Sequence, residues 1–262
     1  MTGSGRAAQW NGPYRAMRLA LLADIHANRE ALEAVLARLA TQRIDRIVLL
    51  GDIVGYGPDP EFCTEKAAEL VGKGALAVIG NHDAAIDGDC SDMNARARAA
   101  IDFTRKRLGA DHRAFLTGLA ETATEGDAYF VHASARAPRS WEYVTGRPQA
   151  ERSIRACPTR LSVVGHVHSP HLWRLNTAGV ATGHVPVTGM EIPLAKSQVW
   201  LAVMGAVGQP RDGNPTAAYG ILDLARGTLL YERAPYDHFT TARKVRDAGL
   251  PHELADRLSR GR

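Results

Sequence analysis

Short polar clusters rich in Asp, Asn and His follow apolar runs at four places in this chain. They read Asp24-Ile25-His26, Gly51-Asp52, Gly80-Asn81-His82-Asp83 and His166-Val167-His168. A buried strand commonly ends where an apolar run ends, so these clusters can converge on one point from distant parts of the sequence. Carboxylate, imidazole and amide oxygen groups are the ligands of two adjacent divalent metals. The pattern therefore predicts metal-assisted hydrolysis of a phosphate ester.

The spacing within the clusters indicates how the ligands are shared. On an extended segment, residues two apart point the same way, so Asp24 and His26 can bind one cation together. His166 and His168 can serve neighbouring sites in the same manner. Asp52 follows a glycine at a strand end, where its two carboxylate oxygens can bridge both ions.

Three further side chains complete the predicted centre. Asn81 offers an amide oxygen, and His132, after the predicted strand 129–131, offers another imidazole. His82 is not needed as a ligand, so we expect it to protonate the leaving alcohol as a general acid. Asp83 is a candidate for orienting His82. Because the ligand set lacks thiolate, we expect two divalent ions drawn from Mn, Fe, Zn, Co or Ni.

The elements that must position these groups alternate between strand and helix in the first half. Strands are predicted over 18–23, 47–50 and 76–79, with helices over 61–71, 91–108 and 111–119 and another helix capped by Asn28. This order is typical of parallel βαβ units, in which functional loops lie at the carboxyl ends of the strands. The second half predicts strands over 129–131, 162–164, 172–175, 199–203, 218–222 and 228–231, read as a mostly antiparallel sheet. Two amphipathic helical patterns follow His238. We therefore expect an α/β fold with sheet packed on sheet and helices outside.

Length and composition frame these expectations. The chain has 262 residues, and 45% of them are hydrophobic, which is enough for one large domain over residues 17–262. Residues 1–16 lack an apolar core and are expected to be a disordered extension without signal or membrane function. The net charge of +4 is spread without a basic run, which is too weak to predict nucleic-acid binding. Three unpaired cysteines favour a reducing cytoplasm.

The order and the residue sequences of these motifs resemble those of the calcineurin-like metallophosphoesterases, in particular a bacterial and archaeal branch of small soluble phosphoesterases. The resemblance implies a four-layer α/β/β/α sandwich, with two mixed β-sheets packed face to face and flanked by helices. It also implies one metal site formed by Asp24, His26, Asp52 and His168, and a second formed by Asp52, Asn81, His132 and His166. A hydroxide that bridges the two metals would then be the nucleophile, and His82 matches the proton donor of the family.

Departures from relatives narrow the expected function. Protein serine/threonine phosphatases continue the second motif with an acid and an arginine, where this chain has Gly55 and Tyr56. We therefore expect a small phosphorylated substrate, either a phosphodiester or a monoester. The alternatives are a nuclease, which is not favoured because no capping domain or basic groove is evident, and a non-catalytic scaffold, which is less favoured because His82 is present. The sequence does not predict the oligomeric state.

Arg211 is the remaining candidate for substrate binding. Its guanidinium can bind a phosphate through two parallel hydrogen bonds. A salt bridge with Asp212 or a solvated loop tip is the competing interpretation. The five histidines outside the motifs are interpreted as packed or surface residues: His112, His171, His184, His238 and His252.

Overall fold

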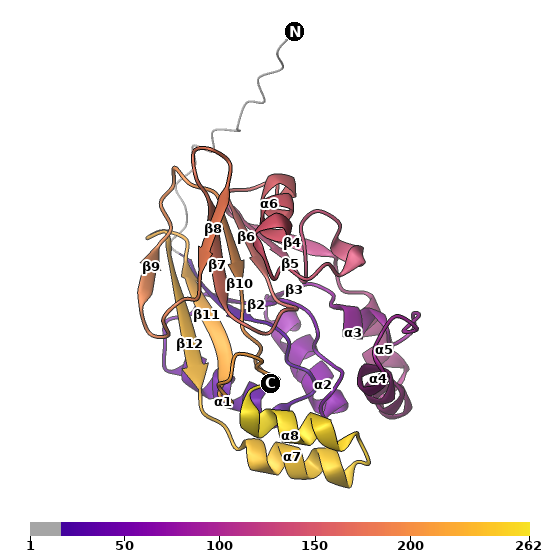
Figure 1. Ribbon diagram of the computed structural model, residues 1–262. Coiled ribbons are helices and arrows are strands. Elements are labelled where there is room, and N and C mark those ends of the chain that lie inside the picture. Colours follow the sequence, from indigo (N-terminus) through magenta and orange to yellow (C-terminus); the bar gives the residue numbers. More distant parts are fainter. Residues whose placement is uncertain (1–16) are drawn as a thin grey trace.

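The computed structural model describes residues 17–262, and the predicted extension 1–16 lies outside the described residues. Two six-stranded sheets pack face to face (Figure 1). The first has the order β3-β2-β1-β11-β12-β9. Its strands are β1 (Arg18–Leu22), β2 (Arg46–Leu49), β3 (Leu76–Ala77), β9 (Glu191–Pro193), β11 (Ala217–Asp223) and β12 (Thr228–Ala234).

The second sheet has the order β4-β5-β6-β10-β7-β8. Its strands are β4 (Thr122–Glu125), β5 (Ala128–Val131), β6 (Leu161–Val164), β7 (His171–Leu175), β8 (Ala181–His184) and β10 (Trp200–Val203). In each sheet three neighbouring strands run parallel, β1-β2-β3 in the first and β5-β6-β10 in the second. The other pairings are antiparallel.

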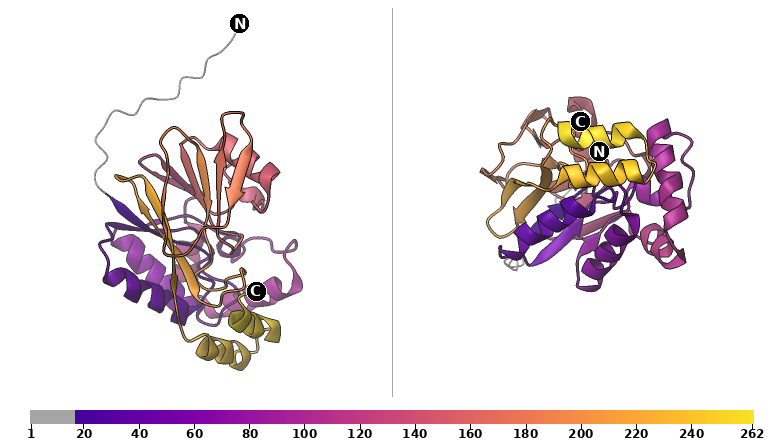
Figure 2. Two further views of the ribbon diagram at one scale, coloured as in Figure 1. Left: turned by 60° about the vertical axis from the view of Figure 1, so that its left-hand side comes forward. Right: turned by 90° about the horizontal axis from the view of Figure 1, so that it is seen from below.

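Helices cover the outer faces of both sheets (Figure 2). They are α1 (Arg29–Ala40), α2 (Pro60–Gly72), α3 (Asn81–Ala84), α4 (Ala95–Arg107), α5 (Ala110–Thr117), α6 (Arg147–Ala156), α7 (His238–Asp247) and α8 (His252–Arg260), with a short 3₁₀ turn at Pro138–Ser140. Over residues 17–262, none of these helices combines the length and the apolar character needed to span a bilayer.

The alternation of side chains along the strands produces three apolar layers between the four layers of structure. Leu19 and Leu21 of β1 point between the sheets, where they share a core with Phe130 of β5. The next residue, Leu22, points to the other face and packs with Leu32 of α1. A third layer lies between the second sheet and α6. Successive strand residues point to opposite faces, so one strand can supply two cores. The predicted α/β/β/α sandwich is confirmed.

One expectation about topology is wrong. The second half of the chain does not form one sheet, because β9, β11 and β12 join the first sheet. Most pairings among its strands are antiparallel, as expected, but β5-β6-β10 pair in parallel. The helix predicted over 91–108 begins only at Ala95, since Asn94 caps it by accepting from the backbone N–H of Ala97. Sequence periodicity reports which residues are buried, but not which sheet a strand joins.

Candidate metal centre

The two sheets meet at the carboxyl ends of their parallel strands, and the candidate ligands lie in the loops there. The loops after β1 and β2 run side by side, since Asp24 N donates to Gly51 O at 3.1 Å and His26 N donates to Asp52 O at 2.9 Å. His166, after β6 of the second sheet, donates its backbone N–H to both oxygens of Asp24, at 3.1 and 3.0 Å. The Asp24 carboxylate therefore links the two sheets at the site.

The backbone of these loops is strained. Left-handed φ angles between 49° and 66° occur at Asp24, His26, Asp52, His166 and His168. Such a conformation costs about 1–3 kcal/mol for a residue other than glycine and persists only where the surroundings impose it. Strain concentrated in five of the seven candidate ligands is typical of a functional site.

The structure brings all seven candidate ligands together in two groups that share Asp52. In the first group, His26 Nε2 lies 3.1 Å from His168 Nε2 and 3.7 Å from Asp52 Oδ2. His168 Nε2 also lies 3.4 Å from Asp24 Oδ1. These four side chains are buried, and their ligand atoms are mutually within 4.8 Å.

The second group lies on the other side of Asp52. His132 Nε2 is 3.4 Å from Asp52 Oδ2, the same oxygen that faces His26. It is also 3.1 Å from His166 Nδ1 and 3.2 Å from Asn81 Oδ1. The residue sets of both groups agree with the division that the family resemblance implies.

The outer ring nitrogens fix the tautomers of the four imidazoles. Each of them donates to a backbone carbonyl, at 2.7 to 3.1 Å: His26 Nδ1 to Val54, His132 Nδ1 to Leu50, His168 Nδ1 to Gln209 and His166 Nε2 to Trp141. In the neutral rings the inner nitrogens then carry lone pairs.

Two such lone pairs face each other 3.1 Å apart in each group. When both rings of a pair are neutral, this arrangement is repulsive unless a cation lies between the acceptors. The donor set therefore fits two divalent ions, and the carbonyl acceptors behind the rings are the support that metal-binding histidines normally have.

Burial and mutual contact perturb the ionisation of these groups. Burial alone would raise the pKa of Asp24, but the His168 and His132 imidazoles lower it to about 2. The pKa of Asp52 is likewise lowered, because His132 and His82 outweigh the effect of burial. Burial, with the neighbouring His132, lowers the pKa of His166 to about 3. Burial lowers the pKa of His132, but the carboxylates of Asp52 and Asp24 outweigh it and raise that pKa to about 9. Charged carboxylates and neutral imidazoles are the forms that bind metal ions, so an ion at this site would displace a proton from His132.

His82 lies beside the centre without entering either group. Its ring packs 4.9 Å from that of His26 and 4.4 Å from that of Tyr56. Nδ1 of His82 is buried and has no hydrogen-bond partner among the described residues. Burial lowers the pKa of His82 to about 4.

Asp83 does not orient His82. Its carboxylate accepts the backbone N–H groups of Ile53 at 2.9 Å, Val54 at 3.2 Å and Gly80 at 3.0 Å. Through these hydrogen bonds Asp83 connects the loop after β2 to the start of α3. Burial and the nearby Asp52 raise its pKa to about 7. The two adjacent side chains point apart, as neighbouring residues in a helical turn do.

Arg211 lies at the rim of the site. Its guanidinium carbon is 5.7 Å from the centre of the Tyr56 ring, and its Nη2 donates to Gln209 Oε1 at 3.1 Å. Nε of Arg211 is buried and unpaired among the described atoms. Asp212 pairs with Arg233 instead, so a salt bridge between Arg211 and Asp212 does not form.

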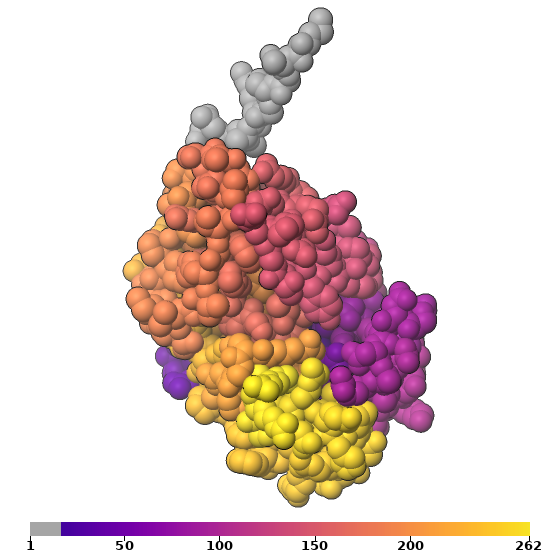
Figure 3. Space-filling view, in the orientation of Figure 1, coloured from indigo at the N-terminus to yellow at the C-terminus, as the bar shows by residue number. Residues whose placement is uncertain are grey.

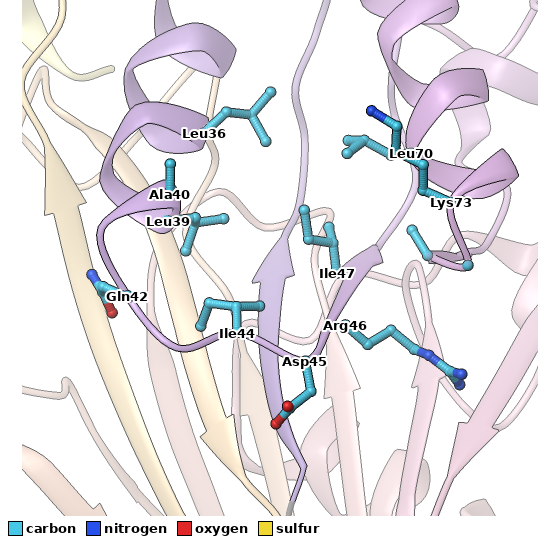
Figure 4. A pocket seen from close by; sticks show the side chains of 12 residues that line it. Leu36, Leu39, Ala40, Gln42, Ile44, Asp45, Arg46, Ile47, Leu70 and Lys73 are labelled. Atoms are coloured by element: carbon cyan, nitrogen blue, oxygen red, sulfur yellow. The ribbon is translucent and has the colours of Figure 1, made fainter.

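A cleft of about 850 Å³ opens beside the candidate centre. Its wall includes His82, Asn81 and His166 together with the aromatic rings of Tyr56, Trp141 and Tyr143. Tyr143 stacks on His166, with ring centres 3.9 Å apart. A second hollow of about 420 Å³ lies at the other end of β2, between α1 and α2 (Figure 4). Its lining is largely aliphatic and includes no candidate ligand, so the chemistry belongs to the first cleft.

The remaining histidines lie outside both candidate groups. His112 contacts Glu65 at 3.3 Å, and His171 packs against Trp173 with ring centres 4.4 Å apart. Sequence reasoning missed the carbonyl groups that orient the imidazoles, because every residue carries a carbonyl. It also missed the packing of Tyr56 against His82, which depends on a loop conformation.

The chain is similar to known proteins over most of its length. The chain is similar to a metallophosphoesterase from Sphaerobacter thermophilus, with 40% identity, a TM-score of 0.84, and coverage of 95% of this chain and 100% of that one. A hypothetical protein from Pyrococcus horikoshii shares the fold at 19% identity and a TM-score of 0.77, over 94% and 99% of the two chains. An uncharacterized protein of Methanocaldococcus jannaschii is 33% identical over 250 residues, or 93% of this chain and 98% of that protein. The model of the calcineurin-like phosphoesterase superfamily domain matches residues 17–227, and the chain belongs to that superfamily.

Proposed function

We propose that this protein is a phosphoesterase that hydrolyses a small phosphorylated molecule at a dinuclear metal centre. The observation that carries the proposal is the pair of imidazole contacts in which inner ring nitrogens face each other at 3.1 Å, both beside the same oxygen of Asp52. The ions would be held by Asp24, His26, Asp52 and His168 on one side and by Asp52, Asn81, His132 and His166 on the other. Two divalent ions there would lower the pKa of a water molecule and offset negative charge on the phosphate oxygens.

The chain's own groups account for binding and proton transfer in this proposal. Arg211 would bind a phosphate oxygen, because its buried Nε lacks a partner in the described structure and guanidinium geometry suits phosphate. His82 would protonate the leaving oxygen. Burial lowers the pKa of His82, but a bound phosphate adds negative charge beside the ring and favours its protonated form. The cleft of about 850 Å³ supports a small substrate.

Two variants test the division of roles. Asp52→Asn should reduce metal occupancy, because the residue faces both groups through one oxygen. His82→Ala should keep the metal content near that of the wild type but lower turnover roughly 10²- to 10⁴-fold. The loss should be greatest for alkyl phosphate esters, whose leaving groups need a proton. Elemental analysis and the hydrolysis of nitrophenyl and alkyl esters would measure both effects, and identical behaviour of the two variants would contradict the proposed roles.

A further inference from the structure

The C-terminal hairpin of α7 and α8 lies beyond residues 17–227, which the family model matches. It packs directly against the candidate site. Leu254, Ala255 and Leu258 of α8 share an apolar cluster with Tyr56 of the site and Ala97 of α4. Figure 3 shows the yellow C-terminal segment beside the purple segment that contains α4. The hairpin is therefore part of the wall around the site.

The end of α8 also fixes the loop that carries Arg211. Gly213 N donates to Gly261 O at 2.8 Å. Gly261 has a φ of +62°, and a Cβ placed there would lie 2.5 Å from Asn214 N. Such a close approach requires glycine. Because α8 contacts both Tyr56 and this loop, its polar face can contribute to the same site.

Arg257 is the polar residue of α8 that can contribute to the site. It is half-buried, and no hydrogen bond or ion pair engages its guanidinium among residues 17–262. Burial lowers its pKa, and the nearby charges of Arg211 and Arg96 lower it further. No carboxylate is among the main influences on Arg257; the opposing ones are the hydroxyl groups of Tyr56 and Tyr143.

Arginines gathered without acidic partners repel one another, and a bound anion relieves the repulsion. Arg96, on α4, is exposed and likewise makes no ion pair in the described structure. The carboxylate of Asp89, on the cleft wall, already accepts from the backbone and hydroxyl groups of Ser91. Asp92 also lies on the cleft wall, but in the described structure no carboxylate forms an ion pair with Arg211, Arg257 or Arg96.

We propose that Arg257 and Arg96 form a second anion subsite next to Arg211, and that the preferred substrate carries a further phosphate group besides the one that is cleaved. This inference rests on the proposed phosphoesterase function, since the subsite serves a substrate whose other phosphate lies at the metal centre. The C-terminal hairpin would then select substrates.

Glucose 6-phosphate and glucose 1,6-bisphosphate test the subsite, because the two sugars differ only in the second phosphate. Their affinities for the metal-loaded protein would be measured by calorimetry and by inhibition of bis(4-nitrophenyl) phosphate hydrolysis. In the wild type we expect the bisphosphate to bind about tenfold tighter, as a charge-assisted contact allows. Arg257→Gln and the exposed Arg96→Gln should each reduce this preference. Arg243→Gln, a matched loss of one exposed charge on α7, should retain it.

The outcomes separate the two proposals. Equal affinity of both sugars in the wild type, or an unchanged preference in both Arg257→Gln and Arg96→Gln, would overturn the subsite. Failure of the metal-loaded wild type to hydrolyse nitrophenyl monoesters and diesters would overturn the proposed function instead. In that case calorimetry would still report whether the arginines prefer the bisphosphate.

Discussion

Gly55 offers a sharp test of the role of His82. A Cβ at this position would lie 2.2 Å from His82 Nδ1 and 2.8 Å from Cγ. Both distances are far shorter than a carbon atom can tolerate, so alanine must displace the imidazole. Gly55 also has a φ of +89°, which costs alanine about 1–2 kcal/mol. Gly55→Ala should therefore lower the free energy of unfolding and move His82 away from the substrate.

Gly74→Ala separates these two effects. Gly74 has a similar φ of +97°, but a Cβ there would have no neighbour within 4 Å. Both variants should lose about 1–2 kcal/mol of unfolding free energy from the backbone alone. Only Gly55→Ala should lose catalysis. If His82 supplies general-acid catalysis, turnover should fall roughly 10²- to 10⁴-fold, which corresponds to about 2.7–5.4 kcal/mol in activation free energy.

The assay is turnover of an alkyl phosphate ester by metal-loaded protein, with metal content and urea denaturation measured on the same samples. Gly55→Ala should retain its metal, because His82 belongs to neither ligand group. Equal turnover in Gly55→Ala and Gly74→Ala would refute the reasoning. It would mean either that His82 is dispensable or that the ring has room to move without consequence.

Two further predictions concern the contacts that hold the start of α1 in place. Asn28→Ala should lower the unfolding free energy by about 2 kcal/mol, because Asn28 caps α1 and also donates to the Gly208 carbonyl at 2.8 Å. The matched change Asn94→Ala, at the exposed cap of α4, should lower it by about 1 kcal/mol only. Equal losses for the two variants in urea denaturation would contradict this difference. Glu30 is partly buried, which raises its pKa, but hydrogen bonds from Lys244 and Thr241 outweigh that effect and hold the pKa below its usual 4.5. A carboxylate whose pKa is lower in the folded state stabilises the protein at pH values above its unfolded-state pKa. This stabilisation is lost as the pH falls through the folded-state pKa. Glu30→Gln should therefore cost about 1 kcal/mol or less at pH 7, and the difference from wild type should fade on acidification; a difference that grows in acid would count against this contact.

The sequence was sufficient to predict the layered fold and to identify the candidate ligand residues. Apolar runs that end in Asp, Asn or His mark strands whose carboxyl ends meet, and this rule brought Asp24, Asp52 and His166 to one edge. The strand predicted over 18–23 is observed as Arg18–Leu22. Such predictions succeed because the local hydrophobic pattern reports which residues are buried.

Features that depend on tertiary contact were not predictable in the same way. The strand expected over 76–79 is observed over Leu76–Ala77 only, and Val78 forms an isolated bridge with Ala120. The 3₁₀ turn at 138–140 presents the Trp141 carbonyl to His166 only through the left-handed Trp141, with a φ of 52°. Arg257 is separated from the motifs by most of the chain, and only the packing of α8 on Tyr56 brings it to the site.

The metal content of the purified protein tests the central claim most directly. After dialysis against Mn²⁺ or Zn²⁺ and removal of free ions, elemental analysis of the wild type should give about two ions per chain, since two ligand groups share Asp52. Asp52→Asn should give markedly fewer. A wild-type protein that is folded yet retains no divalent ion under these conditions would contradict the account.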